Sequence, residues 1–427
     1  MARLNEYKFY TEGKKIETLP LPTKVYIPLS QHLGKPCDKI EVKPGDFVLK
    51  GQLIATSEAK VFSPIHSSIS GKIAGIQDWP HPVLGKAKAI VIDSDGQDKA
   101  QSHNATRSLE EIKKLTPPQI REIVFKAGIV GMGGASFPTH IKLNPPKPVT
   151  SLIVNIAECE PYLTGDSQLT LEKNKEIILG IELVARCLAV KDVFIAIEDN
   201  KPEAIEAMKV AAANTPYTVK VLKSQYPQGG EKQLVKSILS KEIPRGKLPF
   251  DLGVNVQNVS TVFAIFEAVY KNKPLFERVV TVTGSLLTNP KNVLCRIGAP
   301  LKELIDFCGP LKEEPAKIIV GGPMMGIAQF TDMVPVIKST TGVSVLNKTQ
   351  ARAKEEDSCI RCGACVRECS MGLMPCLINQ AAEKGFWQQN KDYGILDCLE
   401  CGLCSFICPS NRKIVQSIKR AKLELNK

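Results

Sequence analysis

Two runs of cysteines near the C-terminal end of the sequence have the spacing of iron–sulfur ligands. Each run follows the pattern C-x2-C-x2-C-x3-C, and the two runs are Cys359, Cys362, Cys365, Cys369 and Cys398, Cys401, Cys404, Cys408. Four thiolates at these offsets hold a [4Fe–4S] cube, because the two-residue gaps let one tight loop supply three corners. The sequence therefore predicts two clusters and one-electron chemistry.

The fourth cysteine of such a run normally binds the other cluster. The predicted ligand sets are therefore Cys359, Cys362, Cys365 and Cys408 for one cluster, and Cys398, Cys401, Cys404 and Cys369 for the other. Paired zinc sites are the alternative, since C-x2-C also binds zinc, although zinc requires no third and fourth cysteine at these offsets. Among the other six cysteines only Cys376, after Pro375, lies in this region; Cys37, Cys159, Cys187, Cys295 and Cys308 are expected to be small buried side chains.

A glycine-rich segment at residues 128–142 predicts a phosphate-binding loop. Four glycines leave backbone N–H groups open to a polyanion; they are Gly128, Gly131, Gly133 and Gly134. The segment lacks the G-x-G-x-x-G order and follows an expected helix, so the usual dinucleotide fingerprint does not apply. A tight structural turn is the alternative interpretation of these glycines.

The composition indicates an ordinary globular protein in a reducing compartment. Hydrophobic residues make up 43% and charged residues 23% of the 427 residues. Residues 1–6 lack the apolar core of a signal peptide, so the fourteen cysteines indicate thiols that bind metals. The most apolar stretch, 177–190, contains Glu182 and Arg186 and is expected to be a buried helix. We expect a cytoplasmic protein, or one bound peripherally to the cytoplasmic face of a membrane.

The net charge of +12 indicates an acidic partner or an anionic surface. The sequence shows no helix–turn–helix, zinc-finger or aromatic RNA-binding motif, so nucleic acid is not an expected partner. In the basic tail, Ile414, Ile418, Ala421 and Leu425 share one helical face. We expect this helix to pack on its own domain, with docking to a membrane subunit or lipid headgroups as the alternative.

The elements that must position these residues fall into four regions of a multidomain α/β and α+β protein. Short strands between Pro, Gly and Asp turns predict an all-β region at 1–98, which is similar to the barrel-sandwich hybrid of biotinyl and lipoyl domains. Residues 109–275 alternate helices with apolar strands, which favours a Rossmann-like sheet covered on both faces. A small α+β module is expected at 276–345, and the cluster domain at 346–427.

Four segments resemble, in the same order, the NADH-binding subunit of respiratory complex I. The segment Gly131-x-Gly133-Gly134-Ala135-x-Phe137-Pro138-Thr139-x-x-Lys142 resembles its flavin-mononucleotide loop. The segments 155–161, 226–231 and 256–261 resemble its N-A-D-E-x-E-P, Y-x-x-G-E-E and V-N-N-V-E-T runs, and residues 279–326 are similar to its ligand-binding β-grasp module.

The order of the four regions resembles the RnfC family, the NAD-side subunits of Rnf ion-translocating ferredoxin:NAD oxidoreductases. The resemblance implies FMN, NAD(H) as substrate, and two [4Fe–4S] clusters in a ferredoxin-like helical domain. It also implies peripheral attachment to the membrane subunits of an Rnf-type complex and indirect electron exchange with ferredoxin. The cofactor-binding residues that it implies are Gly131, Gly133, Gly134, Phe137, Lys142, Asn155, Glu158, Gln257, Asn258 and Thr261, and Glu160 and Glu231 would line the nicotinamide pocket.

Three positions depart from the family pattern. Ala157 stands in place of an Asp, Gly230 in place of a Glu, and Gln257 in place of an Asn. These changes keep a second function open, that of a non-catalytic iron–sulfur or docking subunit with a decayed nucleotide site. A cobalamin-reductase-like flavoprotein is a third possibility, but in that family the barrel-sandwich region follows the flavin domain. For Glu158 and Glu160 the alternative is that they are ordinary solvent-exposed acids at the end of a strand.

Two cubes predict about eight irons and about eight acid-labile sulfides per chain. The measurement is iron, sulfide, zinc and flavin analysis after anaerobic purification. Stoichiometric zinc with little iron after anaerobic reconstitution would contradict the cluster prediction.

Overall fold

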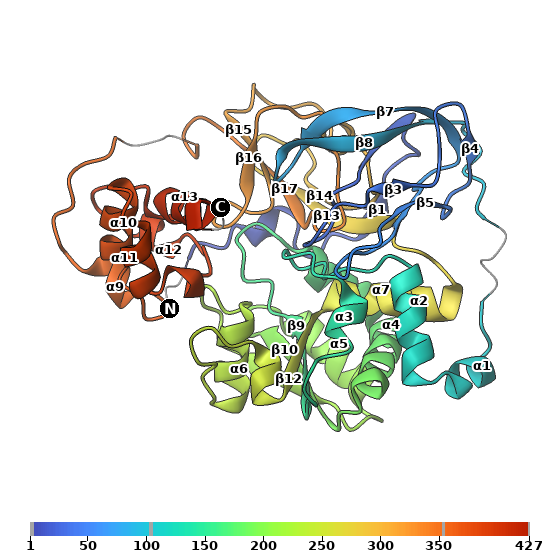
Figure 1. The fold of residues 1–427 in the computed structure, drawn as a ribbon, viewed down its shortest axis with the longest axis horizontal. Helices are drawn as coiled ribbons and strands as arrows, with labels where there is room; N and C mark the ends of the chain where they lie inside the picture. The colour runs from blue at the N-terminus through green and yellow to red at the C-terminus, as the bar shows by residue number, and fades with distance from the viewer. Residues whose placement is uncertain (1–3, 102–105, 352–354, 426–427) are drawn as a thin grey trace.

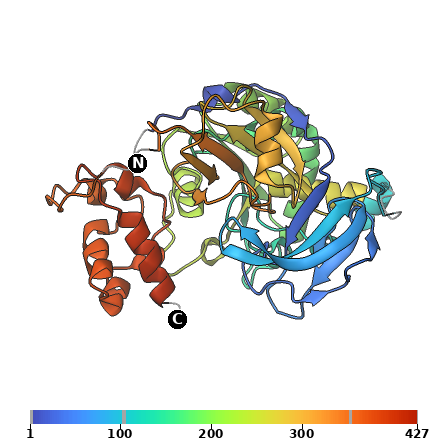
Figure 2. The ribbon, with the colours of Figure 1, turned by 90° about the horizontal axis from the view of Figure 1, so that it is seen from above.

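The computed structural model describes residues 4–101, 106–351 and 355–425 of the chain. It has four parts, each with its own hydrophobic core. Figures 1 and 2 show the helical C-terminal part at one side of the molecule, opposite the N-terminal strands, with the α/β part and a large sheet between them. Within the described residues, no helix is long and apolar enough to cross a membrane.

The N-terminal barrel is built from two small antiparallel sheets. One sheet has the order β2 (Lys24–Pro28), β8 (Gly85–Ser94), β7 (Gly71–His81) and β4 (Phe47–Val48); the other has β3 (Lys39–Ile40), β5 (Leu53–Thr56) and β6 (Ile65–His66). Side chains such as Ile27, Ile54 and Ile90 are fully buried between the two sheets. The all-β pattern expected from the sequence is therefore present in this region.

The first elements of the chain do not belong to this barrel. After the short 3-10 helix η1 (Lys8–Tyr10), strand β1 (Ile16–Thr18) pairs in parallel with β14 (Lys291–Arg296). It forms one edge of a six-stranded mixed sheet with the order β1-β14-β13-β17-β15-β16. The other members are β13 (Glu277–Thr283), β15 (Lys317–Val320), β16 (Ile327–Gln329) and β17 (Gly342–Leu346), and helix α8 (Leu301–Phe307) packs on the sheet.

The α/β part is a parallel sheet of four strands. Its strands are β9 (Ser151–Ile156), β10 (Asp192–Glu198), β11 (Thr218–Leu222) and β12 (Val254–Asn258), in the spatial order β11-β10-β9-β12. The strand order reverses between β9 and β12, and in parallel α/β sheets ligands bind outside the carboxyl ends of the strands at such a point. This topology predicts the position of the site without any reference to sequence motifs.

Helices cover both faces of the parallel sheet, as the sequence predicts. Leu152 and Val154 of β9 face one core with α2 (Pro117–Lys126), α4 (Gly165–Leu188), α5 (Pro202–Ala212) and α7 (Val259–Lys271). Ile153, the residue between them, faces the other core with α6 (Glu231–Leu239). This alternation is the period-2 pattern of a strand that is buried on both sides. Two short helices, α1 (Leu109–Lys114) and α3 (Thr139–Lys142), and the 3-10 helix η2 (Pro249–Leu252) complete this part.

The cluster part, residues 355–425, is a bundle of short helices. They are α9 (Ala364–Arg367), α10 (Pro375–Glu383), α11 (Trp387–Asp392), η3 (Ile395–Asp397), α12 (Leu403–Phe406) and α13 (Ile414–Leu425). Ile414, Ile418 and Ala421 of α13 are buried in the core of this part. The apolar face of the C-terminal helix therefore packs on its own domain, as we expected from the sequence.

A buried lysine joins the N-terminal barrel to the glycine-rich segment. Lys338 Nζ donates to the carbonyl oxygens of Pro64 (2.7 Å) and Gly128 (2.6 Å). Burial lowers the pKa of Lys338 to about 7. Gly128 has a φ of +69°, and a Cβ there would lie 2.4 Å from the Pro64 oxygen. Gly128 is thus required for packing, which separates it from the other glycines of the segment.

Candidate functional site

The glycine-rich loop lies against the N-terminus of α7, at the carboxyl end of β12. The N–H of Met132 donates to Thr261 Oγ1 at 2.9 Å. A Cβ on Gly133 would lie 3.2 Å from Asn258 Cβ, and Asn258 caps α7 by accepting from the N–H groups of Ser260 and Thr261. Gly134 has a φ of +136° with nothing within 4 Å of its Cβ position. The loop is therefore tight on its inner side and open on its outer side, beside a helix N-terminus, which suits an anion such as a phosphate.

The loop is closed at its base by Phe137, whose carbonyl oxygen accepts from the N–H of Gly131 at 2.8 Å. Downstream of the loop, Lys142 Nζ lies 2.5 Å from Glu231 Oε1, so α3 and the start of α6 are in contact. Both side chains remain partly exposed. They place a paired positive and negative charge at the rim of the site.

Amide side chains occupy the carboxyl ends of β9 and β12, where the strand topology predicts a ligand-binding crevice. Asn155 donates to the Gly229 carbonyl oxygen at 2.9 Å. Gln257 donates to Asn255 Oδ1 at 2.9 Å, and Asn255 in turn donates to the Lys142 carbonyl oxygen at 2.8 Å. These bonds fix the sequence-predicted Asn155 and Gln257 on adjacent strands. Asn255, which the motif comparison did not identify, lies near the start of β12 and holds Gln257 and the end of α3 in place.

Glu158 caps helix α4 and is not a solvated strand edge. Its two carboxylate oxygens accept from the N–H groups of Asp166 (2.8 Å) and Ser167 (3.1 Å). Burial raises the pKa of Glu158, while the Lys8 ammonium opposes that shift. Asp166 also accepts from Asn258 Nδ2 at 2.6 Å. The loop after β9 and the N-terminus of α7 are thus linked through two carboxylates, those of Glu158 and Asp166.

Lys8 holds the loop after β9 from the far end of the sequence. Its ammonium donates to the carbonyl oxygens of Glu158 (2.8 Å), Glu160 (3.1 Å) and Leu163 (2.6 Å). Lys8 is buried, with 5% of its surface exposed. No sequence motif indicates this role, because its acceptors lie 150 or more residues away.

Glu160 lies where three parts of the molecule meet. Its Oε1 accepts from the N–H groups of Met324 (2.7 Å) and Met325 (3.1 Å), which precede β16 of the large sheet. Its Oε2 accepts from the Tyr226 hydroxyl at 3.3 Å, and that hydroxyl also donates to the Cys401 carbonyl oxygen at 2.7 Å. Burial raises the pKa of Glu160, and these hydrogen bonds counteract the shift. The Glu160 carboxylate therefore ties the α/β part to the large sheet, and the Tyr226 hydroxyl ties it to the cluster part.

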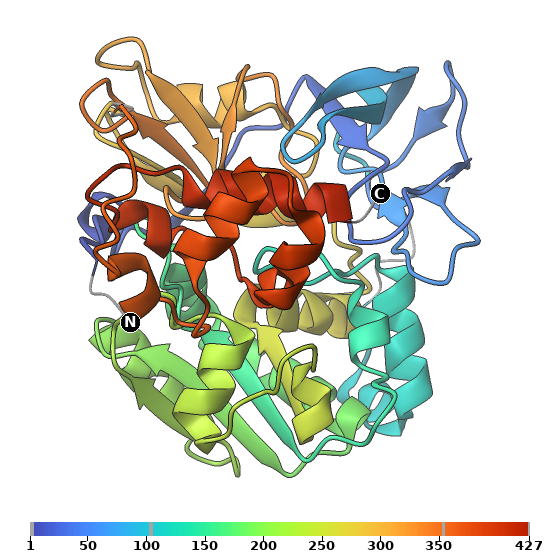
Figure 3. The ribbon, with the colours of Figure 1, turned by 60° about the vertical axis from the view of Figure 1, so that its left-hand side comes forward.

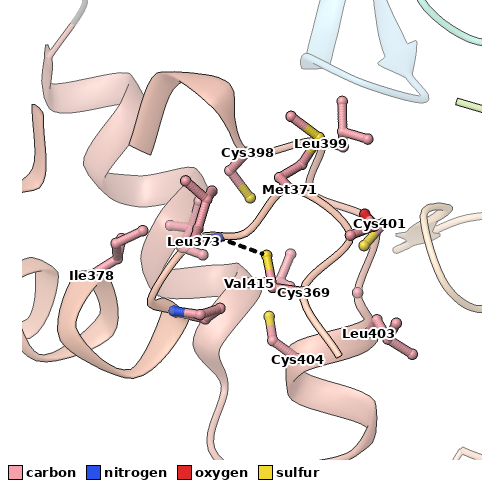
Figure 4. Close-up of a pocket in the computed structure, with 14 residues that line it drawn as sticks. Cys369, Met371, Leu373, Ile378, Cys398, Leu399, Cys401, Leu403, Cys404 and Val415 are labelled. Atoms are coloured by element: carbon pink, nitrogen blue, oxygen red, sulfur yellow. Dashed lines mark hydrogen bonds between the residues drawn. The ribbon is translucent and has the colours of Figure 1, made fainter. Parts of the chain in front are cut away.

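Four cysteines surround one pocket of the cluster part, which we call the inner cluster pocket. They are Cys369, Cys398, Cys401 and Cys404. Figure 4 shows Cys369, Cys398 and Cys404 turned toward one another, with Leu373 and Val415 around them. Burial raises the pKa of the Cys398 thiol to about 11 and that of Cys404 to about 12. The Ser370 hydroxyl at this pocket is buried without a hydrogen-bond partner among the described residues, which fits a pocket that takes a further group.

A second pocket, the outer cluster pocket, is lined by Cys359, Cys362, Cys365, Cys376 and Cys408. Cys359 and Cys362 are exposed, whereas Cys365 is buried. The buried Asn379 lines this pocket with an Oδ1 atom that has no partner among the described residues. The two pockets group the eight cysteines into the sets that the ferredoxin spacing predicts, with Cys376 added to one of them. Across the described part of the chain, no three His, Cys, Asp or Glu side chains converge as ligands of a single metal ion would.

Beside the inner cluster pocket, the cluster part contacts the start of α6. Lys232 Nζ and Asp397 Oδ1 are 3.0 Å apart, and Gln233 donates to the Ser370 carbonyl oxygen at 3.4 Å. Figure 3 shows the cluster part lying in front of the α/β part and the large sheet. Because Glu231 of the same helix contacts Lys142, the first turn of α6 reaches both the crevice and the inner cluster pocket.

Three family models match this chain. Residues 2–97 match the RnfC barrel sandwich hybrid domain, residues 124–267 the Nuo51 FMN-binding domain, and residues 279–328 the SLBB domain. The predicted N-terminal barrel-sandwich hybrid and flavin-type α/β region are thereby confirmed as domain types.

Curated relatives match almost the whole chain. The relative from Clostridium ljungdahlii, which belongs to the proton-translocating ferredoxin:NAD(+) oxidoreductase complex, is 47% identical over 98% of this chain and 92% of its own length. Its Na(+)-translocating counterpart from Acetobacterium woodii is 41% identical over 95% and 91%, and the relative from the ion-translocating oxidoreductase complex of Rhodobacter capsulatus is 42% identical over 98% and 81%. Each of the three is the equivalent subunit of its complex.

Solved structures show a likeness of fold. An NAD+-reducing [NiFe]-hydrogenase in the air-oxidized state has a TM-score of 0.51 at 19% identity, over 75% of this chain and 63% of that chain. This likeness spans less than two thirds of the hydrogenase chain, and at this identity it concerns the fold alone.

Cys369→Ala and Cys398→Ala should remove the same cluster, because both residues line the inner cluster pocket. Each variant should keep about four irons and the same residual EPR spectrum after dithionite reduction. Cys359→Ala serves as the comparison, and its residual spectrum should differ. If Cys369→Ala instead gave the spectrum of Cys359→Ala, the predicted crossover of the fourth cysteines would be wrong.

Gly133→Val should abolish flavin binding and leave the iron content unchanged, because a Cβ there already contacts Asn258 at 3.2 Å. A matched control is Gly75→Val in strand β7, where nothing lies within 4 Å of the Cβ position. Flavin and iron are measured on both purified variants. Full flavin occupancy in Gly133→Val would refute the role of the loop.

Proposed function

This chain belongs to the RnfC family of ion-translocating ferredoxin:NAD(+) oxidoreductase complexes, and we propose that it is the subunit that exchanges electrons with NAD(H). In this proposal hydride passes between NAD(H) and FMN, and single electrons pass through two [4Fe–4S] clusters. The observation that carries it is the first turn of α6, where Glu231 contacts the crevice and Lys232 contacts the cluster part at Asp397. One short segment thus brings a nucleotide-type site and a thiol pocket together.

The crevice between β9 and β12 has the groups that FMN requires. The N-terminus of α7 and the glycine-rich loop would hold the phosphate, and Asn155, Gln257 and Asn258 would hold the polar groups of the flavin. Lys142 supplies a positive charge beside the crevice, 2.5 Å from Glu231. When bound, FMN supplies the exchange between electron pairs and single electrons. The chain's own task is to fix these side chains, which the hydrogen bonds of Asp166 and Asn255 do.

Glu231 and Glu160 have different parts in the proposed nicotinamide site. Glu231 is 42% exposed at the rim, so its carboxylate is open to a bound nucleotide. Glu160 accepts from Met324, Met325 and Tyr226 and would shape the pocket wall by holding its loop in place. We also infer that residues 279–326 form the β-grasp module and the cluster part a two-cluster ferredoxin-like domain.

The two thiol pockets give the proposed electron path an order. The inner cluster pocket lies beside the crevice, where a Cβ on Gly230 would approach Leu399 to 3.4 Å. The outer cluster pocket has exposed ligands, Cys359 and Cys362, which suits exchange with a partner protein. We place that partner among the membrane subunits of the complex, with ferredoxin reached indirectly and this chain held peripherally at the cytoplasmic face.

The second candidate is a non-catalytic iron–sulfur or docking subunit with a decayed nucleotide site, which we call the wire subunit because it would only conduct electrons. Ala157 and Gly230 are the residues that favour it. Packing, however, explains why a glycine stands at position 230. A Cβ at this position would lie 2.3 Å from Gln233 Oε1 and 3.4 Å from Leu399 of the inner cluster pocket. A side chain at this position would have to move the end of Gln233, which donates to the Ser370 carbonyl oxygen of the cluster part, so the glycine fits this contact and is not by itself a sign of decay.

NADH should reduce the flavin of the FMN-loaded chain in stopped-flow mixing, followed by loss of cluster absorbance. Glu231→Gln should raise the NADH concentration needed for half-maximal reduction several-fold and leave FMN content unchanged, because it removes the rim carboxylate. Glu242→Gln, a surface carboxylate that pairs with Lys236, is the matched control. If dithionite reduces the flavin and NADH does not, the wire-subunit function replaces the catalytic one.

A further inference from the structure

The outer cluster pocket contains one more thiol than a [4Fe–4S] cube uses. Its lining includes Cys376 beside the four predicted ligands, whereas the lining of the inner cluster pocket includes four cysteines. Cys376 is not part of either C-x2-C-x2-C-x3-C run. It is half-buried at the second position of α10, directly after Pro375.

Cys376 lies close to one of the predicted ligands, Cys365. Both cysteines line the outer cluster pocket, their helices α10 and α9 contact each other, and Cys376 packs against the core cluster that contains Cys365. Its helix, α10, is anchored by Ile378 in the core of the cluster part, so the thiol is held at the pocket by a packed element. By contrast, Cys359 and Cys362 are exposed and lie before the first residue of α9.

We propose that Cys376 is a reserve ligand of the outer cluster, able to take the iron corner that Cys365 holds. This proposal rests on the proposed function, since it requires a cluster in the outer cluster pocket. A thiol that lines the same pocket, on a helix that contacts the helix of Cys365, can reach this corner with a small movement. The buried Asn379, with its Oδ1 that lacks a partner among the described residues, lines the same pocket and fits a polar group bound there.

The exchange balances without an oxidant or a reductant. The Fe–S bond to Cys365 breaks and an Fe–S bond to Cys376 forms. The proton leaves the Cys376 thiol, and the released Cys365 sulfur takes up a proton. The charge of the site and the number of thiolate ligands stay the same.

The test compares Cys365→Ala with the Cys365→Ala/Cys376→Ala double variant, both in the full chain and reconstituted anaerobically. Cys365→Ala should keep about eight irons, and the double variant about four. The EPR spectrum of reduced Cys365→Ala should show both clusters, with the signal of the outer cluster shifted by the new ligand. Cys404→Ala is the matched control, because it is the third cysteine of the other run and the inner cluster pocket is lined by four cysteines. It should keep about four irons.

Flavin content reports on folding in every variant. A wild-type chain without iron would overturn the proposed function itself. A wild-type chain with about eight irons and a Cys365→Ala variant with about half of them would overturn only the role of Cys376. Retention of the outer cluster in the double variant would also refute that role, because another group would then complete the corner.

Discussion

The reversal of strand order between β9 and β12 is the constraint on which the rest of the molecule depends. All four strands are parallel, so the loops after β9 and β12 leave the sheet at the same edge and diverge. The glycine-rich loop occupies the space between them and contacts Asn258 and Thr261 at the start of α7. Without that divergence, there would be no crevice for the backbone N–H groups of the loop to face.

Two sets of contacts, which we call joints, then fix the other parts of the molecule relative to the crevice. The first is the start of α6, which contacts α3 through Glu231 and the cluster part through Lys232. The second is Glu160, whose carboxylate accepts from the large sheet and from Tyr226. Both joints use charged or polar groups, whose hydrogen bonds have preferred lengths and directions. Electron transfer depends steeply on distance, so such joints suit this function.

Sequence patterns predict the local elements of this fold well. The apolar stretch 177–190, expected to be a buried helix, lies in α4 as far as Leu188. The apolar face expected in the basic tail is the buried face of α13, because hydrophobic periodicity reports how a segment is buried. The cysteine spacing likewise predicts which thiols share a pocket. Periodicity carries no information about partners far along the chain. For that reason the contacts of Lys8 with the loop after β9, the capping of Glu160 by residues 324 and 325, and the pairing of β1 with β14 become visible only in the structure.

The pairing of β1 with β14 has a consequence for how the protein is made. Strand β1 pairs with β14, and just before it Lys14 donates to the Pro290 carbonyl oxygen, 276 residues further along the chain. The partner of the first strand is therefore synthesised much later than the strand itself. At ribosomal speeds of roughly 5–20 residues per second, the delay is on the order of tens of seconds. During that interval the N-terminal barrel and the parallel sheet can form, while the edge of the large sheet cannot. Completion of that sheet is therefore a late step of biogenesis, because β1 can pair with β14 only after residue 296 has been synthesised.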